Sequence, residues 1–167
     1  MANINGFEIE RKFLIEYPDV KKLALIDGSK IMKISQSYLE DKSRIRKIEQ
    51  NGEIRYIKTV KKHITDIKRE EKEWEISEEE YLLDIKNRAK GTKTIEKTRY
   101  AVPFNDFIIE IDVFDFWSDR AFAEIELKSE DEQFVLPDFI KVIKEVTFDK
   151  RYRNSALSRK IVRDEII

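Results

Sequence analysis

The amino-acid sequence predicts an α+β fold in which an eight-stranded antiparallel β-barrel, or tunnel, has a charged interior and helices packed outside. Three observations lead to this expectation. Segments with period-two alternation outnumber helical ones, charged side chains stand at alternate positions in seven of these segments, and an Asn51-Gly52 hairpin turn is expected between two of them. No Gly-, Pro- or Ser-rich linker divides the chain, so we expect a single domain over residues 1–167.

The alternation predicts strands with short connections, which favour antiparallel neighbours. The predicted strands are residues 7–16, 36–49, 53–62, 69–76, 93–101, 106–116, 121–129 and 145–152. In several of them the face opposite the charges is apolar, as with Ile109, Ile111 and Val113 in the sixth strand. Such apolar faces need cover, and if helices leave part of them open a homodimer is expected.

Four segments are predicted to be helical: residues 17–27, 77–91, 137–146 and 154–167. The second has the clearest boundaries, because Ser77 suits the N-cap, Glu80 is its capping-box partner and Gly91 follows as a stop. These amphipathic segments could pack on the outside of the barrel.

The composition excludes several classes of function. Lys and Arg number 33 and Asp and Glu 34, so a net charge of −1 gives no general attraction to duplex nucleic acid or to an anionic membrane. There are no cysteines, no apolar run near 20 residues and no signal-peptide pattern, which together lead us to expect a cytoplasmic protein. The only histidine, His63, is interpreted as an ordinary surface residue.

The charged positions are sorted by sign from strand to strand. Acids gather in the first, fourth, sixth and seventh predicted strands, and bases in the second, third and fifth. A solvated sheet face has no reason to separate signs in this way, since mixed surfaces are the norm. We therefore expect these side chains to face a wet barrel interior, where divalent cations would balance the carboxylates and a polyanion would balance the bases.

Ligation by carboxylates alone, without Cys or His, favours Mg²⁺ or Mn²⁺ over zinc. A linear array of bound cations and bases matches a chain of phosphates.

The segment "EIERK" at residues 8–12 resembles the ExExK signature of the CYTH family, also called triphosphate tunnel metalloenzymes. The motifs that follow in order extend the resemblance over nearly the whole chain: "RIR" at 44–46, "TVK" at 59–61, "REEKE" at 69–73, "EKTRY" at 96–100, "IEID" at 109–112, "AEIEL" at 123–127 and "EVTFDKRYRNSAL" at 145–157. The resemblance implies an eight-stranded tunnel that binds triphosphate-containing substrates with Mg²⁺ or Mn²⁺, and a C-terminal helix that closes one tunnel mouth.

The resemblance also assigns roles to residues. The implied metal ligands are Glu8, Glu10, Glu110, Asp112, Glu124 and Glu126. The implied phosphate ligands are Lys12, Arg44, Arg46, Lys61, Lys97, Arg99 and Lys150, with Arg151 or Arg153 as substitutes for Lys150. Glu71, Glu73, Lys61 and Arg44 are expected to be catalytic. Glu75 and Lys58 are not part of the family pattern: Glu75 is expected at a tunnel mouth, and the strand phase of Lys58 places it on the outer face.

The expected activity is metal-dependent hydrolysis of a phosphoanhydride, with inorganic tripolyphosphate cleaved to pyrophosphate and phosphate. Trp74 and Trp117 are out of phase with the neighbouring carboxylates and are interpreted as core residues, which leaves no aromatic platform for an organic group. Three alternatives stay open: a class IV-type adenylate cyclase, a thiamine triphosphatase, and a non-catalytic sensor of polyphosphate or nucleotides.

Overall fold

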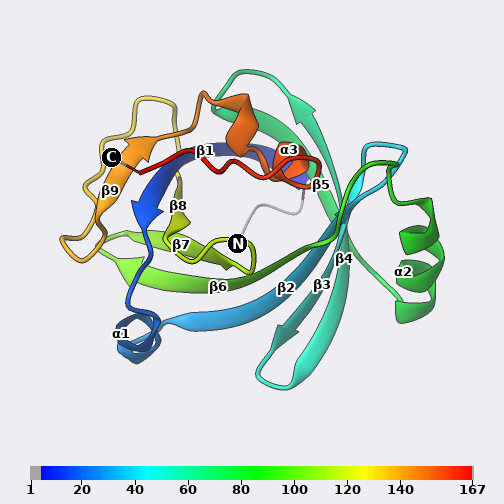
Figure 1. Cartoon of the computed structure of the whole chain (residues 1–167), viewed down its shortest axis with the longest axis horizontal. Coiled ribbons are helices and arrows are strands. Elements are labelled where there is room, and N and C mark those ends of the chain that lie inside the picture. Colours follow the sequence, from blue (N-terminus) through cyan, green and yellow to red (C-terminus); the bar gives the residue numbers. More distant parts are fainter. Residues whose placement is uncertain (1–4, 167) are drawn as a thin grey trace.

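The computed structural model describes residues 5–166, and within them nine strands form one antiparallel sheet (Figure 1). The strands are β1 (Asn5–Glu16), β2 (Lys30–Tyr38), β3 (Arg44–Gln50), β4 (Glu53–His63), β5 (Lys68–Ile76), β6 (Ile95–Phe104), β7 (Phe107–Phe114), β8 (Arg120–Glu126) and β9 (Val142–Glu145). The first eight close a ring in the order β1-β5-β4-β3-β2-β6-β7-β8, because β1 pairs with both β5 and β8. The predicted eight-stranded antiparallel barrel is confirmed.

The ring closes along one edge of β1, which has two successive partners there. Residues 5–9 of β1 pair with β5, and residues 13–15 pair with β9. The ninth strand therefore covers the part of the β1 edge that β5 leaves open, so that backbone groups of this edge are hydrogen-bonded.

Two of the predicted strands are wrong. Residues 36–49 contain the end of β2, a turn and most of β3, because Asp41 accepts hydrogen bonds from Ser43 and Lys42 adopts a positive φ of 69°. Residues 145–152 are not a strand, since a turn and the 3₁₀-helix η2 (Lys150–Tyr152) follow β9.

The predicted helix at 137–146 is also wrong, because its second half is β9, whose backbone pairs with the edge of β1. The predicted C-terminal helix is limited to α3 (Asn154–Leu157), and residues 160–166 have no regular structure. Residue 167, the last of that prediction, lies outside the described residues.

The two predicted helices in the first half of the chain are present but short. They are α1 (Val20–Leu25), capped by Asp19, and α2 (Glu78–Asp84), in which Ser77 Oγ accepts from Glu80 N at 3.0 Å and which continues as the 3₁₀-helix η1 (Ile85–Asn87). Figure 1 shows α2 on the outside of the ring, and its Tyr81 packs with Ile45 and Ile76 from the outer strand faces. In the part of the chain that the structure describes, no helix has the length and apolar character to span a bilayer.

The apolar core lies outside the ring, since the strands turn alternate side chains outward. Ile15, Val102, Ile109 and Ile111 are completely buried there, under Leu23 of α1 and other cover. Trp74, by contrast, is 44% exposed on the outer surface, so its interpretation as a core residue is wrong.

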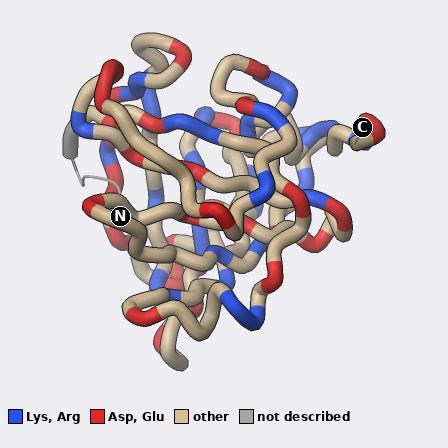
Figure 2. The backbone as a smooth tube through the Cα atoms, turned by 90° about the vertical axis from the view of Figure 1, so that its left-hand side faces the viewer, with Lys and Arg blue, Asp and Glu red and all other residues tan. Residues whose placement is uncertain are grey.

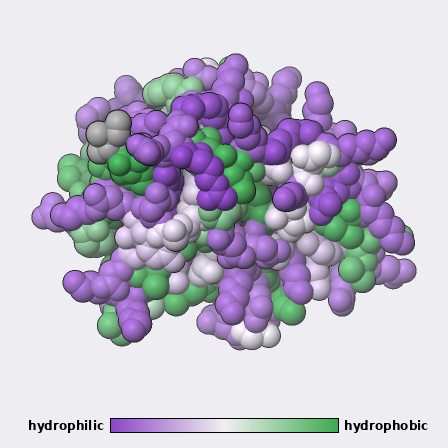
Figure 3. All heavy atoms as spheres, in the orientation of Figure 1, coloured by the Kyte–Doolittle hydropathy of each residue, from purple (hydrophilic) through white to green (hydrophobic). Residues whose placement is uncertain are grey.

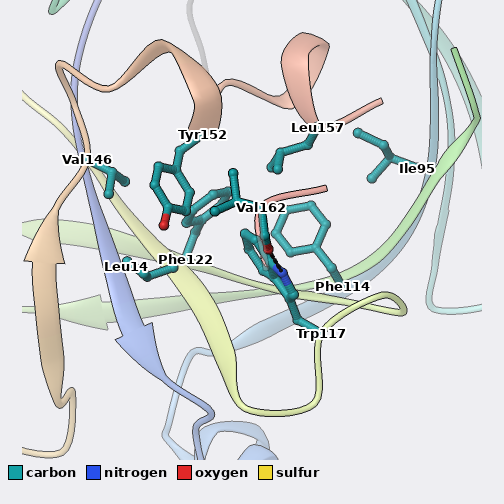
Figure 4. Close-up of a cluster of buried hydrophobic side chains, with 9 residues drawn as sticks. All are labelled: Leu14, Ile95, Phe114, Trp117, Phe122, Val146, Tyr152, Leu157 and Val162. Carbon is teal, nitrogen blue, oxygen red and sulfur yellow. Dashed lines mark hydrogen bonds between the residues drawn. The ribbon is translucent and has the colours of Figure 1, made fainter. Parts of the chain in front are cut away.

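The inner face changes from charged to apolar at one level of the barrel. Leu14, Ile95, Phe114 and Phe122 each stand two residues beyond a charged inward position, namely Lys12, Lys97, Asp112 and Glu124. They pack against Trp117, Val146, Tyr152, Leu157 and Val162, most of them from the C-terminal part of the chain (Figure 4). Trp117 Nε1 donates to the Val162 carbonyl at 2.9 Å. We call these nine residues the aromatic plug.

Because the aromatic plug supplies much of the buried apolar area, we expect Phe122→Ala to lower the free energy of unfolding by about 3–5 kcal/mol. Phe122 is completely buried and contacts the rings of Phe114, Trp117 and Tyr152. Leu25→Ala, at an 84% exposed position, serves as the control and should change the free energy of unfolding by less than about 0.5 kcal/mol. Urea unfolding followed by fluorescence measures both, and equal effects would contradict the role of the plug.

Candidate active site

A cavity of about 810 Å³ occupies the barrel interior. Eleven basic and six acidic side chains line it, so its lining is positively charged although the whole chain has a net charge of −1. Figure 2 shows Lys, Arg, Asp and Glu distributed along the strands, and Figure 3 shows hydrophilic side chains over most of one face of the molecule. The charge segregation expected from the sequence is thus located inside the ring.

The acids of the cavity lie mainly on neighbouring strands. Glu8 and Glu10 come from β1, Glu110 from β7, Glu124 from β8, and Glu71 and Glu73 from β5. This crowding changes their protonation. Burial raises the pKa of Glu10 well above its usual range, helped by the charges of Glu124 and Glu8.

Glu71 is the acid most clearly in need of a partner. It is 1% exposed, and no donor in the described part of the chain forms a hydrogen bond with either carboxylate oxygen. Burial, together with its neighbours Glu8 and Glu73, raises its pKa to about 9. Glu73 shows the opposite behaviour: despite burial, the neighbouring Glu71 and the charge of Arg46 lower its pKa. Near neutral pH, Glu71 is therefore protonated and Glu73 is ionised.

The same set of oxygens suits a hard divalent cation. Carboxylate oxygens are the ligands that Mg²⁺ and Mn²⁺ prefer. The buried oxygens of Glu71 have only a distant ion-pair partner among the described residues, Lys61 Nζ at 4.0 Å from Oε2. Within residues 5–166, no group of three or more acidic or histidine side chains is already arranged to hold a metal ion. The carboxylate side chains of the cavity are therefore of the right chemical type to bind a divalent cation, but their oxygens are not yet placed around a single point.

The bases show a matching need for anions. Arg44 and Arg46 on β3 each have a buried Nε without a hydrogen-bond partner. Burial and the charge of Arg44 lower the pKa of Arg46 to about 10, although Arg46 Nη2 lies 3.3 Å from Glu73 Oε2. Lys61 Nζ is 2.8 Å from Glu8 Oε2 at the junction of the basic and acidic walls. Arginines whose N–H groups are only partly used in this way can hold phosphate oxygens.

The structure brings most of the predicted site residues into the cavity lining, but not all of them. Lys97 and Asp112 lie behind the wall, paired with each other at 2.9 Å, and burial lowers the pKa of Lys97 to about 8. Glu126 and Glu75 do not line the cavity, and Lys58 pairs outside it with Asp84 at 3.0 Å, as expected for an outer-face residue. Lys150 is exposed on η2 and also lies off the cavity, whereas its alternative Arg153 lines it.

Several lining residues were missed. Arg55 and His63 share the inward phase of Thr59 and Lys61 on β4, and Arg69 shares that of Glu71 on β5, so strict counting by two would have found them. The interpretation of His63 as an ordinary surface residue is incomplete, because it is exposed and yet lines the cavity. Lys42 and Arg159 lie in turns, where strand periodicity gives no information.

One wall of the cavity is apolar. Met32 and Ile34 on β2, Ile48 on β3 and Ile57 on β4 are lining residues and contact one another. Trp117 does not line the cavity, in agreement with its interpretation as a core residue.

The raised pKa of Glu71 predicts how stability depends on pH in the metal-free protein. Between about pH 4.5 and 9, Glu71 is protonated when folded and ionised when unfolded, so unfolding releases a proton and stability falls as pH rises. This group contributes a slope of about 1.4 kcal/mol per pH unit, which Glu71→Gln should remove. Urea unfolding in EDTA at several pH values measures the slope. Glu75→Gln on the same strand is the control, and a slope unchanged in Glu71→Gln would contradict the prediction.

Comparison with known proteins agrees with this architecture. The model of the CYTH domain family matches residues 6–155. The inorganic triphosphatase of Nitrosomonas europaea is 33% identical over 162 residues, which cover 92% of this chain and 98% of that relative. The crystal structure of an inorganic triphosphatase is 31% identical, with a TM-score of 0.58 over 96% of this chain and 97% of the other. A conserved hypothetical protein from Pyrococcus furiosus, 19% identical, shares the fold with a TM-score of 0.52 over 74% and 80% of the two chains. The chain belongs to the CYTH domain family.

Proposed function

We propose that this protein is a metal-dependent phosphoanhydride hydrolase that cleaves inorganic tripolyphosphate to pyrophosphate and phosphate. The observation that carries the proposal is that one cavity is lined both by the buried oxygens of Glu71 and by the buried Nε atoms of Arg44 and Arg46, none of which has a hydrogen-bond partner among the described residues. A metal triphosphate offers a cation to the first set and anionic oxygens to the second. The similarity to an inorganic triphosphatase supports the same choice.

The cation would be held by the acids of β1, β7 and β8 that line the cavity, namely Glu8, Glu10, Glu110 and Glu124. We propose Mg²⁺ or Mn²⁺, because every donor is a carboxylate oxygen. A bound cation of this kind neutralises phosphate oxygens and lowers the pKa of a bound water.

The phosphate oxygens would be held by Lys12, Arg44, Arg46, Lys61, Arg99 and Arg153, all of which line the cavity. Arginine forks suit bidentate contact with phosphate, and fixed donors of this kind stabilise the charge that builds up as the bridging bond breaks. Arg44 and Lys61 are the bases we place nearest the reaction. Lys61 is opposite Glu71 in the strand register, and Arg44 is opposite Thr59, whose other neighbour is Glu73.

The hydrolytic step requires a proton acceptor. The oxygen of a water molecule attacks the terminal phosphorus, the bond from that phosphorus to the bridging oxygen breaks, and pyrophosphate leaves with the bonding electrons. Glu73, ionised because its pKa is lowered, takes the proton of the water, while Glu71 keeps its own.

The apolar wall favours a second candidate function. Met32, Ile34, Ile48 and Ile57 could contact the organic part of an organic triphosphate, such as the thiazole or base of thiamine triphosphate or ATP. The protein would then be a thiamine triphosphatase, an adenylate cyclase or a sensor that binds without turnover.

One assay separates these functions. The purified protein is incubated with Mg²⁺ or Mn²⁺ and tripolyphosphate, ATP or thiamine triphosphate, and released phosphate, pyrophosphate and cyclic AMP are measured. Fastest release of phosphate from tripolyphosphate supports the first proposal. Faster turnover of an organic substrate supports the second, and tight binding without any turnover indicates a sensor.

We expect Glu10→Gln to abolish metal-dependent turnover while the fold is kept or stabilised, because Glu10 is crowded by Glu8 and Glu124. Activity is measured with excess Mn²⁺ and stability by thermal unfolding. Turnover at the wild-type rate would show that Glu10 does not contribute to the metal site.

We expect Arg153→Ala to reduce turnover of tripolyphosphate by on the order of 10²-fold, as for removal of one charge-stabilising contact. Lys150→Ala, three residues earlier and off the cavity, is the matched control and should change little. Steady-state kinetics of both variants measure the two effects. A larger loss of turnover in Lys150→Ala than in Arg153→Ala would show that Lys150 is the phosphate ligand.

A further inference from the structure

Lys97, Arg99 and Asp112 form a buried ion-pair cluster between β6 and β7. The Lys97 side chain is 1% exposed and the Asp112 side chain 0%, and their Nζ and Oδ2 atoms are 2.9 Å apart. Of the three residues, Arg99 alone lines the cavity. The other two are therefore separated from the cavity by the residues that line it.

Asp112 holds Arg99 by both of its oxygens. Arg99 Nε lies 2.8 Å from Oδ1 and Nη2 lies 2.9 Å from Oδ2, which is the bidentate arrangement that fixes the plane of a guanidinium. Lys97 donates to the same Oδ2. Asp112 thus accepts three charge-assisted hydrogen bonds and has no free oxygen for a cation.

Glu110 contacts Arg99 in a different way. Its Oε2 lies 2.7 Å from Arg99 Nη1, but its side chain is 20% exposed and lines the cavity. Glu110 can turn toward a cation after losing one hydrogen bond, whereas Asp112 would lose three. The two acids of the "EID" motif share a strand face and differ in what they can bind.

We propose that Asp112 and Lys97 are positioning residues for Arg99, an inference that rests on the proposed function. A guanidinium has five N–H groups, of which Asp112 and Glu110 take three. Asp112 fixes the orientation in which the remaining N–H groups face the triphosphate. Lys97 holds Asp112 in place by donating to its Oδ2, and it does not contact phosphate.

The first test compares two ligands of the full-length protein. Asp112→Asn should weaken binding of tripolyphosphate, measured by calorimetry in EDTA, by on the order of 10–100-fold, because a misoriented Arg99 loses its contacts. Binding of Mn²⁺ alone should be unchanged. Loss of Mn²⁺ binding with tripolyphosphate binding retained would overturn the proposal, because Asp112 would then be a metal ligand.

The second test asks whether Lys97 acts through Asp112. Tripolyphosphate binding is measured for Lys97→Met, Asp112→Asn and the double variant. If Lys97 acts through Asp112, the double variant binds about as well as Asp112→Asn alone. Additive losses would show an independent contact between Lys97 and phosphate and would overturn its assignment.

The third test requires no substrate and separates this inference from the proposed function. Hydrogen exchange of Arg99 Nε–H, followed by ¹⁵N NMR, should be slow in the wild type and fast in Asp112→Asn. Asp84→Asn, which breaks the Lys58–Asp84 pair outside the cavity, is the matched control, and hydrogen exchange of Arg99 Nε–H should stay slow in it. Fast exchange in the wild type would overturn the positioning role, and slow exchange without any binding of tripolyphosphate would reject only the proposed function.

If Asp112→Asn fails to fold, which urea unfolding reveals, Arg99→Lys takes its place. Lysine keeps the charge but has no fork, so it should lose tripolyphosphate binding about as strongly as Arg99→Ala. Retained binding in Arg99→Lys would show that orientation by Asp112 is unimportant.

Discussion

Buried charge without a partner is the constraint on which this structure depends. The oxygens of Glu71 and the Nε atoms of Arg44 and Arg46 are shielded from water and make no hydrogen bond with any residue in the described range 5–166. A charge in such a place is costly, so the group either changes its protonation, as Glu71 does, or binds a counter-ion. A ligand that carries both a cation and a row of anionic oxygens supplies counter-ions to the buried acids and to the buried arginines at the same time.

A barrel with charges inside must take its stability from elsewhere. The apolar contacts that fold most proteins around their centre lie here on the outer strand faces, where Ile15, Val102 and Ile109 are completely buried. The aromatic plug adds a second cluster at one end, tied to the C-terminal chain by Trp117 and Val162. The outer cluster lies on the other side of the strands from the cavity, so charged residues inside can change with little loss of its packing. The plug borders the cavity, since Lys12 Nζ lies 4.7 Å from the centre of the Phe122 ring.

Sequence periodicity predicted which face each strand turns inward, because a strand reverses its side chains at every residue. It could not predict pairing over long range. Residues 142–145 become a strand only because the edge of β1 beyond Ile9 lacks another partner, and nothing local in "VIKE" indicates this. The turn at Asp41–Ser43 could have been predicted locally, because Asp and Ser favour turns through side-chain hydrogen bonds of the kind seen here. The alternating pattern on both sides of the turn led instead to the prediction of one long strand.

Periodicity also gave no information about depth along the barrel, and depth decides the chemistry of the site. Glu110, Asp112 and Phe114 share one face of β7 but have different roles. Glu110 lines the cavity, Asp112 is a buried ion-pair partner, and Phe114 belongs to the aromatic plug. Along β6, Arg99, Lys97 and Ile95 follow the same order. Each step of two residues moves a side chain roughly 6–7 Å toward the closed end, where less water remains to solvate it. A charged residue there must be paired, and so it becomes part of the wall rather than a ligand.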